Sequence, residues 1–243
     1  MMPFKLKEHR FFWPIKLFLK RLFGRELRIF PDIKTNTLFL DEWEICPDFI
    51  DKNSIIFSLG VGDSVAFDMK LIETFKSTVY AFDPTPFAKE WIKKQPSSEN
   101  FNFFPWAVSG EDRLLEMHQR INRKGEKSKV MWTEIRGDHD NPLVIQVESY
   151  SLDSIMKKLN VNKIDLLKMD VEGSEYEIID TILDMNNKPS QLLVEFHHRF
   201  PNIGFEKTNN AIKNLHKIGY RIFSVSKTGR ELGFIQKNLF SDL

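Results

Sequence analysis

Short apolar segments alternate with longer amphipathic segments along the chain, beginning near residue 55. The apolar segments are rich in Ile, Leu, Val and Phe and predict strands at residues 55–59, 79–82, 101–104, 164–169, 192–196, 221–225 and 234–235. The amphipathic segments predict helices at residues 65–75, 86–94, 152–159, 174–183 and 206–218. Strands that are apolar throughout suit a sheet covered on both faces, so this alternation favours a doubly wound α/β fold.

Two regions depart from this alternation. Residues 1–50 precede the first strand, and we predict that they form a basic helical extension or cap on a main domain of residues 51–243. Residues 114–118 and 143–147 predict strands, and residues 120–141 between them are polar. We interpret residues 114–147 as an insertion at the rim of a ligand site, with a plain solvated loop as the alternative.

Composition narrows the class of protein. Of the 243 residues, 42% are hydrophobic and 28% charged, which is ordinary for a globular domain with a real core. The net charge of +1 gives no overall basic signature, so we expect no nucleic-acid partner. The single cysteine, Cys46, cannot form an intramolecular disulfide, and no apolar segment reaches the ~20 residues that span a bilayer. We therefore expect a cytoplasmic protein.

Basic charge is concentrated at the N-terminus. Residues 1–28 hold eight basic and two acidic residues, a net charge of +6, which leaves about −5 on the remaining chain. On a helix, Phe11, Ile15, Phe18 and Leu22 would form one apolar stripe. Residues 4–28 are therefore a candidate contact region. We favour a helix docked on the domain or on a second subunit, and the alternative is an interfacial helix at the inner face of a membrane.

The first predicted strand runs into a glycine turn, residues 58–64 (SLGVGDS), before a helix begins. In open α/β sheets, ligands bind beyond the carboxyl ends of the strands. Gly60 and Gly62 allow a sharp turn and a close approach of the backbone to a ligand, although a simple tight turn needs the same residues. We predict a cofactor-binding loop made of Gly60, Val61, Gly62, Asp63 and Ser64.

The second predicted strand ends in an acid, Asp83, and is followed by Pro84. An acid at this position can accept hydrogen bonds from both hydroxyls of an adenosine ribose, whether in a nicotinamide dinucleotide or in S-adenosylmethionine. We predict that Asp83 and Pro84 contact the ribose side of a cofactor. We also predict a backbone contact from Trp106, Ala107 and Val108, while the Trp106 ring itself is expected to pack.

The glycine turn favours a sulfonium cofactor over a dinucleotide. A dinucleotide loop has a third glycine near residues 64–65, so that a helix N-terminus can hold the pyrophosphate, and this chain has none there. Asp63 would repel a pyrophosphate but attract a sulfonium and an ammonium group. Asp68 would act in the same way, unless it only compensates the helix dipole.

Three segments together resemble the FkbM methyltransferase family. Residues 164–175 (IDLLKMDVEGSE) resemble its "DLLKIDVEGxE" signature, residues 150–154 (YSLDS) its "TLD" lead-in, and residues 192–197 (LLVEFH) its "ilvEvH" strand. The resemblance covers roughly residues 55–235. It implies a Rossmann-like class I methyltransferase with a mostly parallel seven-stranded sheet whose last strand is antiparallel. It also implies S-adenosylmethionine as cofactor and methyl transfer to oxygen on a sugar or another small hydroxylated molecule.

The glycine turn departs from the common form of that family. Many members carry an acid where Ser58 stands, and a later glycine near the position of Ser64. The sequence resembles a divergent branch in which Asp63 and Asp68 supply the acids.

A hydroxyl acceptor needs a base, because an alcohol is a poor nucleophile. Asp170, Glu172 and His197 are the candidate catalytic residues, since they follow two predicted central strands. Asp170 could also face the cofactor, Glu172 could cap the next helix, and His197 could be a structural histidine or a base that titrates near neutral pH. Asp170, Glu195 and His197 could together bind a divalent cation.

The sequence thus predicts an S-adenosylmethionine-dependent O-methyltransferase for a small hydroxylated acceptor, such as a sugar or glycan precursor. Two alternative functions remain as hypotheses. An NAD-dependent oxidoreductase is disfavoured by the missing third glycine. A cofactor-binding scaffold without catalysis is left open by Ser58 and Ser64.

Overall fold

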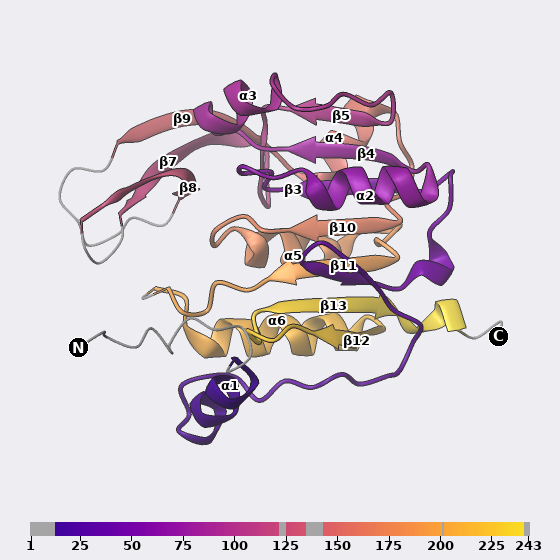
Figure 1. The fold of residues 1–243 in the computed structure, drawn as a ribbon, viewed down its shortest axis with the longest axis vertical. Coiled ribbons are helices and arrows are strands. Elements are labelled where there is room, and N and C mark those ends of the chain that lie inside the picture. The colour runs from indigo at the N-terminus through magenta and orange to yellow at the C-terminus, as the bar shows by residue number, and fades with distance from the viewer. Residues whose placement is uncertain (1–12, 122–124, 135–142, 201, 241–243) are drawn as a thin grey trace, which may run out of the picture.

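A computed structural model describes residues 13–121, 125–134, 143–200 and 202–240 (Figure 1). The main sheet contains β3 (Ile55–Leu59), β4 (Thr78–Phe82), β5 (Phe101–Phe104), β10 (Leu166–Met169), β11 (Gln191–Glu195), β12 (Tyr220–Val225) and β13 (Glu231–Gln236). Its order is β12-β13-β11-β10-β3-β4-β5. Strands β11, β10, β3, β4 and β5 run parallel, whereas β13 is antiparallel to both of its neighbours. The doubly wound, mostly parallel sheet with an antiparallel last strand is confirmed.

Helices cover both faces of this sheet. Successive side chains of each strand point to opposite faces, and most residues of the central strands β3, β10 and β11 are apolar and buried, so both faces have to be covered. The helices are α2 (Ala66–Phe75), α3 (Pro86–Ile92), α4 (Leu152–Leu159), α5 (Glu175–Asp184) and α6 (Gly204–Lys217). Phe57 packs in a core with residues of α4, α5 and α6, while its neighbour Ile56 packs in a second core with α2. The predicted helices are all present, with ends that differ by a few residues.

Residues 107–150 form a second, smaller sheet, which corrects part of the sequence interpretation. It contains β6 (Ala107–Val108), β7 (Arg113–Ile121), β8 (Lys127–Thr133) and β9 (Val144–Tyr150) in the order β6-β9-β7-β8. Strand β8 lies inside the polar residues 120–141, for which we had predicted no strand. Trp132 anchors it, since this ring is buried against Leu115 and Met117. Residues 122–124 and 135–142, including Gly137, lie outside the described residues.

The predicted N-terminal helical extension is confirmed by a helix, but residues 23–50, which follow it, do not continue as a helical cap. Helix α1 (Trp13–Leu22) is present, but a hairpin of β1 (Leu38–Leu40) and β2 (Trp43–Ile45) and a short turn η3 (Pro47–Phe49) follow it. Trp43 and Ile45 of the hairpin pack in the same core as Ile56. The last element among the described residues is a single turn, η4 (Lys237–Phe240). Among the described helices, none has the length and apolar character needed to cross a membrane.

Candidate active site

The glycine turn between β3 and α2 is shaped by the neighbouring strand β10. Gly60 has a φ of +83°, and a Cβ placed on it would lie only 1.9 Å from the carbonyl oxygen of Asp170. The amide of Gly60 donates to the carbonyl of Phe82 (2.9 Å) and the amide of Asp170 to that of Leu59 (3.0 Å). Gly60 is therefore required by the contact between two strand ends, whatever the turn binds.

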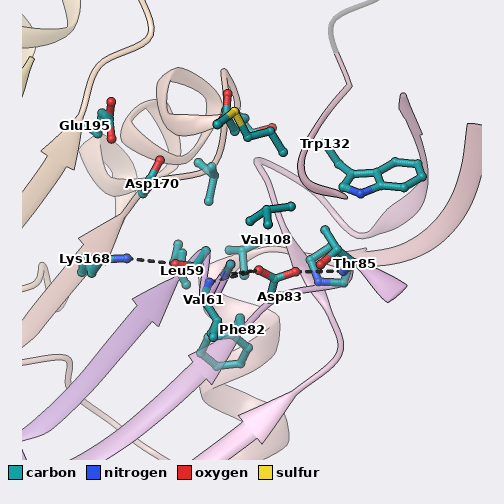
Figure 2. A pocket seen from close by; sticks show the side chains of 18 of the residues that line it. Leu59, Val61, Phe82, Asp83, Thr85, Val108, Trp132, Lys168, Asp170 and Glu195 are labelled. Carbon is teal, nitrogen blue, oxygen red and sulfur yellow. Dashed lines mark hydrogen bonds between the residues drawn. The ribbon is translucent and has the colours of Figure 1, made fainter. Parts of the chain in front are cut away.

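Asp83 holds this turn in place. Its Oδ2 accepts hydrogen bonds from the amides of Val61 (3.0 Å) and Gly62 (2.8 Å), and its Oδ1 accepts one from the amide of Thr85 (2.9 Å), as Figure 2 shows. Burial raises the pKa of Asp83, and its hydrogen bonds with Thr85, Gly62 and Val61 oppose the rise. The carboxylate predicted to bind a ribose is thus engaged with backbone amides. Ribose binding stays a prediction and would use the lone pairs that these bonds leave.

Two buried groups of opposite charge lie beneath the turn, Asp68 on α2 and Lys168 on β10. The Lys168 ammonium donates to the carbonyl of Gly60 (2.9 Å) and lies over the ring of Trp43, 5.6 Å from its centroid. Asp68 is 3% exposed, and its Oδ1 has no hydrogen-bond partner among the described residues. Burial raises the pKa of Asp68, while Lys168 and the nearby Ser58 hydroxyl, which itself has no hydrogen-bond partner among the described residues, oppose the rise. Because buried carboxylates are normally satisfied, this oxygen is a ready acceptor for a ligand's donor.

Asp170, Glu172 and His197 meet where β10 and β11 end. The Nε2 atom of His197 lies 3.8 Å from Oδ1 of Asp170 and 3.6 Å from Oε2 of Glu172, and its Nδ1 lies 3.4 Å from Oε1 of Glu175. Burial favours the neutral imidazole, but Glu175, Glu172 and Asp170 outweigh it and raise the pKa of His197 to about 9. His197 is therefore an imidazolium at neutral pH, and the expected titration near neutrality moves to alkaline pH.

The small sheet fixes Glu172 in an unusual backbone conformation. Its φ is +50°, in the left-handed region that few residues other than glycine adopt. The Thr133 hydroxyl donates to its carbonyl oxygen (2.6 Å), and Arg120 donates to its Oε2 (2.6 Å). Burial raises the pKa of Glu172, while His197 and Arg120 oppose the rise. The side chain of Glu172 thus points to Arg120 and His197, and strain of this kind is typical of functional sites.

Glu195 pairs with an arginine instead of joining Asp170 and His197 in the predicted metal site. Its Oε1 pairs with Arg230 (2.6 Å), and burial together with Asp170 raises its pKa to about 7. In the described part of the chain, the group whose ligand atoms all lie within 4.8 Å of one another is Asp170, Glu172 and His197. Glu172 therefore takes the place in the candidate metal site that we had given to Glu195.

One cavity of about 740 Å³ joins the turn to this cluster, a volume that is ordinary for a ligand site. Every predicted site residue lines it: Gly60, Val61, Gly62, Asp63, Ser64, Asp68, Asp83, Pro84, Trp106, Ala107, Val108, Asp170, Glu172, Glu195 and His197. Arg120, Arg199 and Arg230 also line it, and sequence reasoning missed them. They come from the small sheet and two loops, and no local pattern distinguishes them from surface arginines.

Trp106 has the packing role that we expected for its ring. It lies 4.6 Å from Phe104 and 5.2 Å from Tyr150, measured between ring centroids, and stacks beside Phe82. This aromatic row supports the part of the cavity wall that Ala107 and Val108 line, and their backbone contact with a cofactor stays a prediction.

The sheet order and a cavity beyond the carboxyl ends of the parallel strands define a Rossmann-like protein of the class I methyltransferase type. The family follows from a direct match. A model of the FkbM methyltransferase domain matches residues 51–222, and the chain belongs to this family.

Individual relatives are distant. The rat protein described as probable methyltransferase-like protein 24 is 27% identical over a match of 118 residues that covers 42% of this chain and 32% of the rat protein. The chain thus spans about a third of the length of this curated relative. A solved FkbM methyltransferase from Methylobacillus flagellatus has 10% identity and a TM-score of 0.46, over 76% of this chain and 44% of that one. The fibrillarin pre-rRNA processing protein of Methanococcus jannaschii has 13% identity and a TM-score of 0.44, over 87% and 86%.

Proposed function

We propose that the chain is an S-adenosylmethionine-dependent methyltransferase that methylates a hydroxyl oxygen of a small acceptor, such as a sugar or glycan precursor. Family membership supports methyl transfer. The proposed cofactor and acceptor sites rest on one observation. The glycine turn and Asp68, whose Oδ1 has no hydrogen-bond partner among the described residues, line the same cavity as Asp170, Glu172 and His197. Membership also weighs against the NAD-dependent oxidoreductase.

The residues present fit this cofactor. Asp68 offers a buried, unpaired carboxylate oxygen, and Asp63 an exposed one, to the ammonium and sulfonium charges. Gly60 and Gly62 keep the turn free of side chains, with φ values of +83° and +58°. Phe82 and other apolar side chains of the wall suit an adenine ring.

The remaining groups suit removal of a proton from the acceptor. S-adenosylmethionine supplies a methyl group that is already activated on a sulfonium, so the protein has to bind, orient and deprotonate. The Asp170 side chain is 37% exposed, against 18% for Glu172 and 4% for His197, so an acceptor hydroxyl reaches Asp170 first. In this assignment Asp170 takes the hydroxyl proton. The His197 imidazolium and the Glu172–Arg120 pair hold that carboxylate in position.

The test has two stages. In calorimetry, S-adenosylmethionine and S-adenosylhomocysteine should bind and NAD should not. Transfer of a labelled methyl group to a panel of sugars should then identify the acceptor, and Asp170→Asn should lower turnover by ~10²–10⁴, the usual range for a positioned base. Binding without transfer to any acceptor would favour the scaffold. An Asp170→Asn protein that loses cofactor affinity instead of turnover would make Asp170 a cofactor ligand.

A divalent cation held by Asp170, Glu172 and His197 is a second proposal for the same site. Carboxylate oxygens and an imidazole suit such an ion, which would polarise the acceptor hydroxyl. His197 would have to release its proton to bind the ion. Loss of turnover on chelation, restored by Mg²⁺ or Mn²⁺, would support this role, and full turnover after chelation would exclude it.

A further inference from the structure

Helix α1 presents an apolar ridge to solvent. The exposed fractions along the helix are 55% for Ile15, 65% for Phe18, 45% for Leu19 and 54% for Leu22, and Phe23 directly after it is 69% exposed. These positions repeat at three and four residues and therefore share one face of the helix. The opposite face docks on the domain through Leu17, whose Cδ1 would lie 3.0 Å from a Cβ placed on Gly229. The helix is thus anchored with its apolar ridge outward, a feature that marks interaction sites in soluble proteins.

A cationic pocket borders the ridge. A cavity of about 110 Å³ is lined by Lys16, Leu17, Lys20, Arg199, Lys227, Thr228 and Arg230. Arg199 pairs with Glu26 and Arg230 with Glu195, whereas the three lysines make no ion pair with any residue in the described part of the chain. Burial lowers the pKa of Lys20, and Arg199, Lys16 and Arg230 lower it further against the opposing pull of Glu26. The pocket therefore carries positive charge that an anion would compensate.

We propose that α1 docks the protein on an anionic lipid surface, with its apolar ridge inserted at the interface and Lys16, Lys20 and Lys227 on headgroup phosphates. An apolar face flanked by lysines is the pattern of interfacial helices. A second copy fits less well, because the two N-terminal regions, each with a net charge of +6 over residues 1–28, would be brought together. A ten-residue helix, ~15 Å long, is also small beside the ~800 Å² per partner of a stable dimer.

The same surface lies close to the candidate active site. Arg199 and Arg230 line both the cationic pocket and the large cavity. Helix α1 lies beyond the β12 edge of the sheet, towards the end at which the parallel strands finish (Figure 1). Docking on lipid would therefore bring the cavity near the membrane surface. The docking itself does not depend on the proposed methyl transfer.

Flotation of the full chain with vesicles tests the proposal. Vesicles of phosphatidylcholine with about a third phosphatidylglycerol should bind the protein, and pure phosphatidylcholine should bind it at least ~tenfold more weakly. Phe18→Ser with Leu22→Ser should abolish binding, and Lys16→Glu, Lys20→Glu and Lys227→Glu together should lower it at least ~tenfold. The matched controls are Phe39→Ser, another exposed aromatic, and Lys52→Glu, Lys89→Glu and Lys94→Glu together, which change the net charge equally elsewhere.

Both controls should bind like the unchanged protein, and all variants should keep its thermal unfolding midpoint. Equal binding by the α1 variants and their controls would overturn the proposal, as would failure of the unchanged protein to bind anionic vesicles. A concentration-dependent dimer that Phe18→Ser with Leu22→Ser dissociates, without any vesicle binding, would assign the ridge to a second copy instead.

Discussion

At the residue scale, the buried carboxylates around the cavity differ in whether they have partners. Asp83 is satisfied by three backbone amides, Glu195 by Arg230, and Glu175 by the amides of Gly173 and His197. Asp68 is as buried as Asp83, but its Oδ1 has no hydrogen-bond partner in the described part of the chain. Since an unsatisfied buried acceptor costs stability, a bound cation would recover that cost. Asp68 therefore has the strongest physical reason to bind a ligand.

Asp68→Asn should lower the affinity for S-adenosylhomocysteine by ~1–3 kcal/mol, because the ammonium would lose a hydrogen bond to a charged group. Asp63→Asn is the matched control, since it removes the same charge from the exposed part of the turn, where solvent screens the interaction. Calorimetry on both variants measures the difference. A larger loss in Asp63→Asn would transfer the ammonium contact to the turn, and unchanged affinity in both would leave the acids without a cofactor role.

His197 should make stability depend on pH. Its folded pKa of about 9 lies above the ~6.5 of an unperturbed histidine, so the folded state binds this proton more tightly. The resulting stability is fully present below ~6.5 and is lost as the pH rises to about 9, up to ~3 kcal/mol in total. Glu195, with a pKa raised to about 7, acts at lower pH, so the window from pH 7 to 10 separates the histidine from Glu195, and comparison with His197→Gln removes the contribution of other groups. Urea unfolding should show this slope in the unchanged protein and not in His197→Gln; parallel curves would contradict it.

The residues that sequence reasoning found are those that local motifs carry. The glycine turn, Asp170 and Glu172 directly follow strands, so their place at one edge of the sheet follows from the fold class alone. Their protonation state does not follow from the fold class, because the pKa of His197 depends on Glu175, the first residue of helix α5. Arg120 and Arg230 reach the site only through tertiary packing, which no single-sequence pattern encodes.

At the scale of elements, the central strands and their helices were predictable because their apolar patterns are long and regular. Strand β8 was not, since Lys127 and Lys129 made its sequence look like a loop. Their side chains are exposed, while Trp132 is buried, which is the weak alternation of an edge strand. The strand is held by its pairing with β7, and it carries Thr133 to the Glu172 carbonyl. The small sheet is thus part of the site rather than a rim loop.

Gly60→Ala tests whether the contact between β3 and β10 fixes the turn. The added Cβ would meet the Asp170 carbonyl at 1.9 Å, so the strand ends would have to separate. Gly204→Ala is the control, because Gly204 has a similar φ of +77° with nothing within 4 Å of its Cβ and therefore costs only backbone strain of ~1 kcal/mol. We expect a larger loss of unfolding free energy in Gly60→Ala, together with loss of cofactor binding. Equal losses in both would show that the turn adapts.

At the scale of the whole molecule, the N-terminal region divides into two parts that differ in their contacts. Helix α1 contacts the rest of the protein through Leu17 and through Arg21, which donates to the carbonyls of Leu27 and Ile29. Glu26 is instead buried between His198 and Arg199. Burial alone would raise the pKa of Glu26, but those two partners lower it to about 2. The sequence showed the basic and apolar pattern of the region but not which part joins the core. Cytoplasmic residence and the lack of a nucleic-acid partner stay predictions.

Removing residues 1–23 should lower the free energy of unfolding by no more than changing one residue beyond them. The deletion removes the Leu17 contact, ~1.5–3 kcal/mol, and the Arg21 hydrogen bonds to the Leu27 and Ile29 carbonyls, ~1 kcal/mol each or less because water replaces the guanidinium. It should leave the affinity for S-adenosylhomocysteine unchanged. Glu26→Ala leaves His198 buried and Arg199 without its carboxylate, which should cost ~3–5 kcal/mol. Urea unfolding and calorimetry on the two variants measure both effects. Loss of cooperative unfolding in the deletion would mean that α1 belongs to the core, and its apolar ridge would then have a structural role as well as an interfacial one.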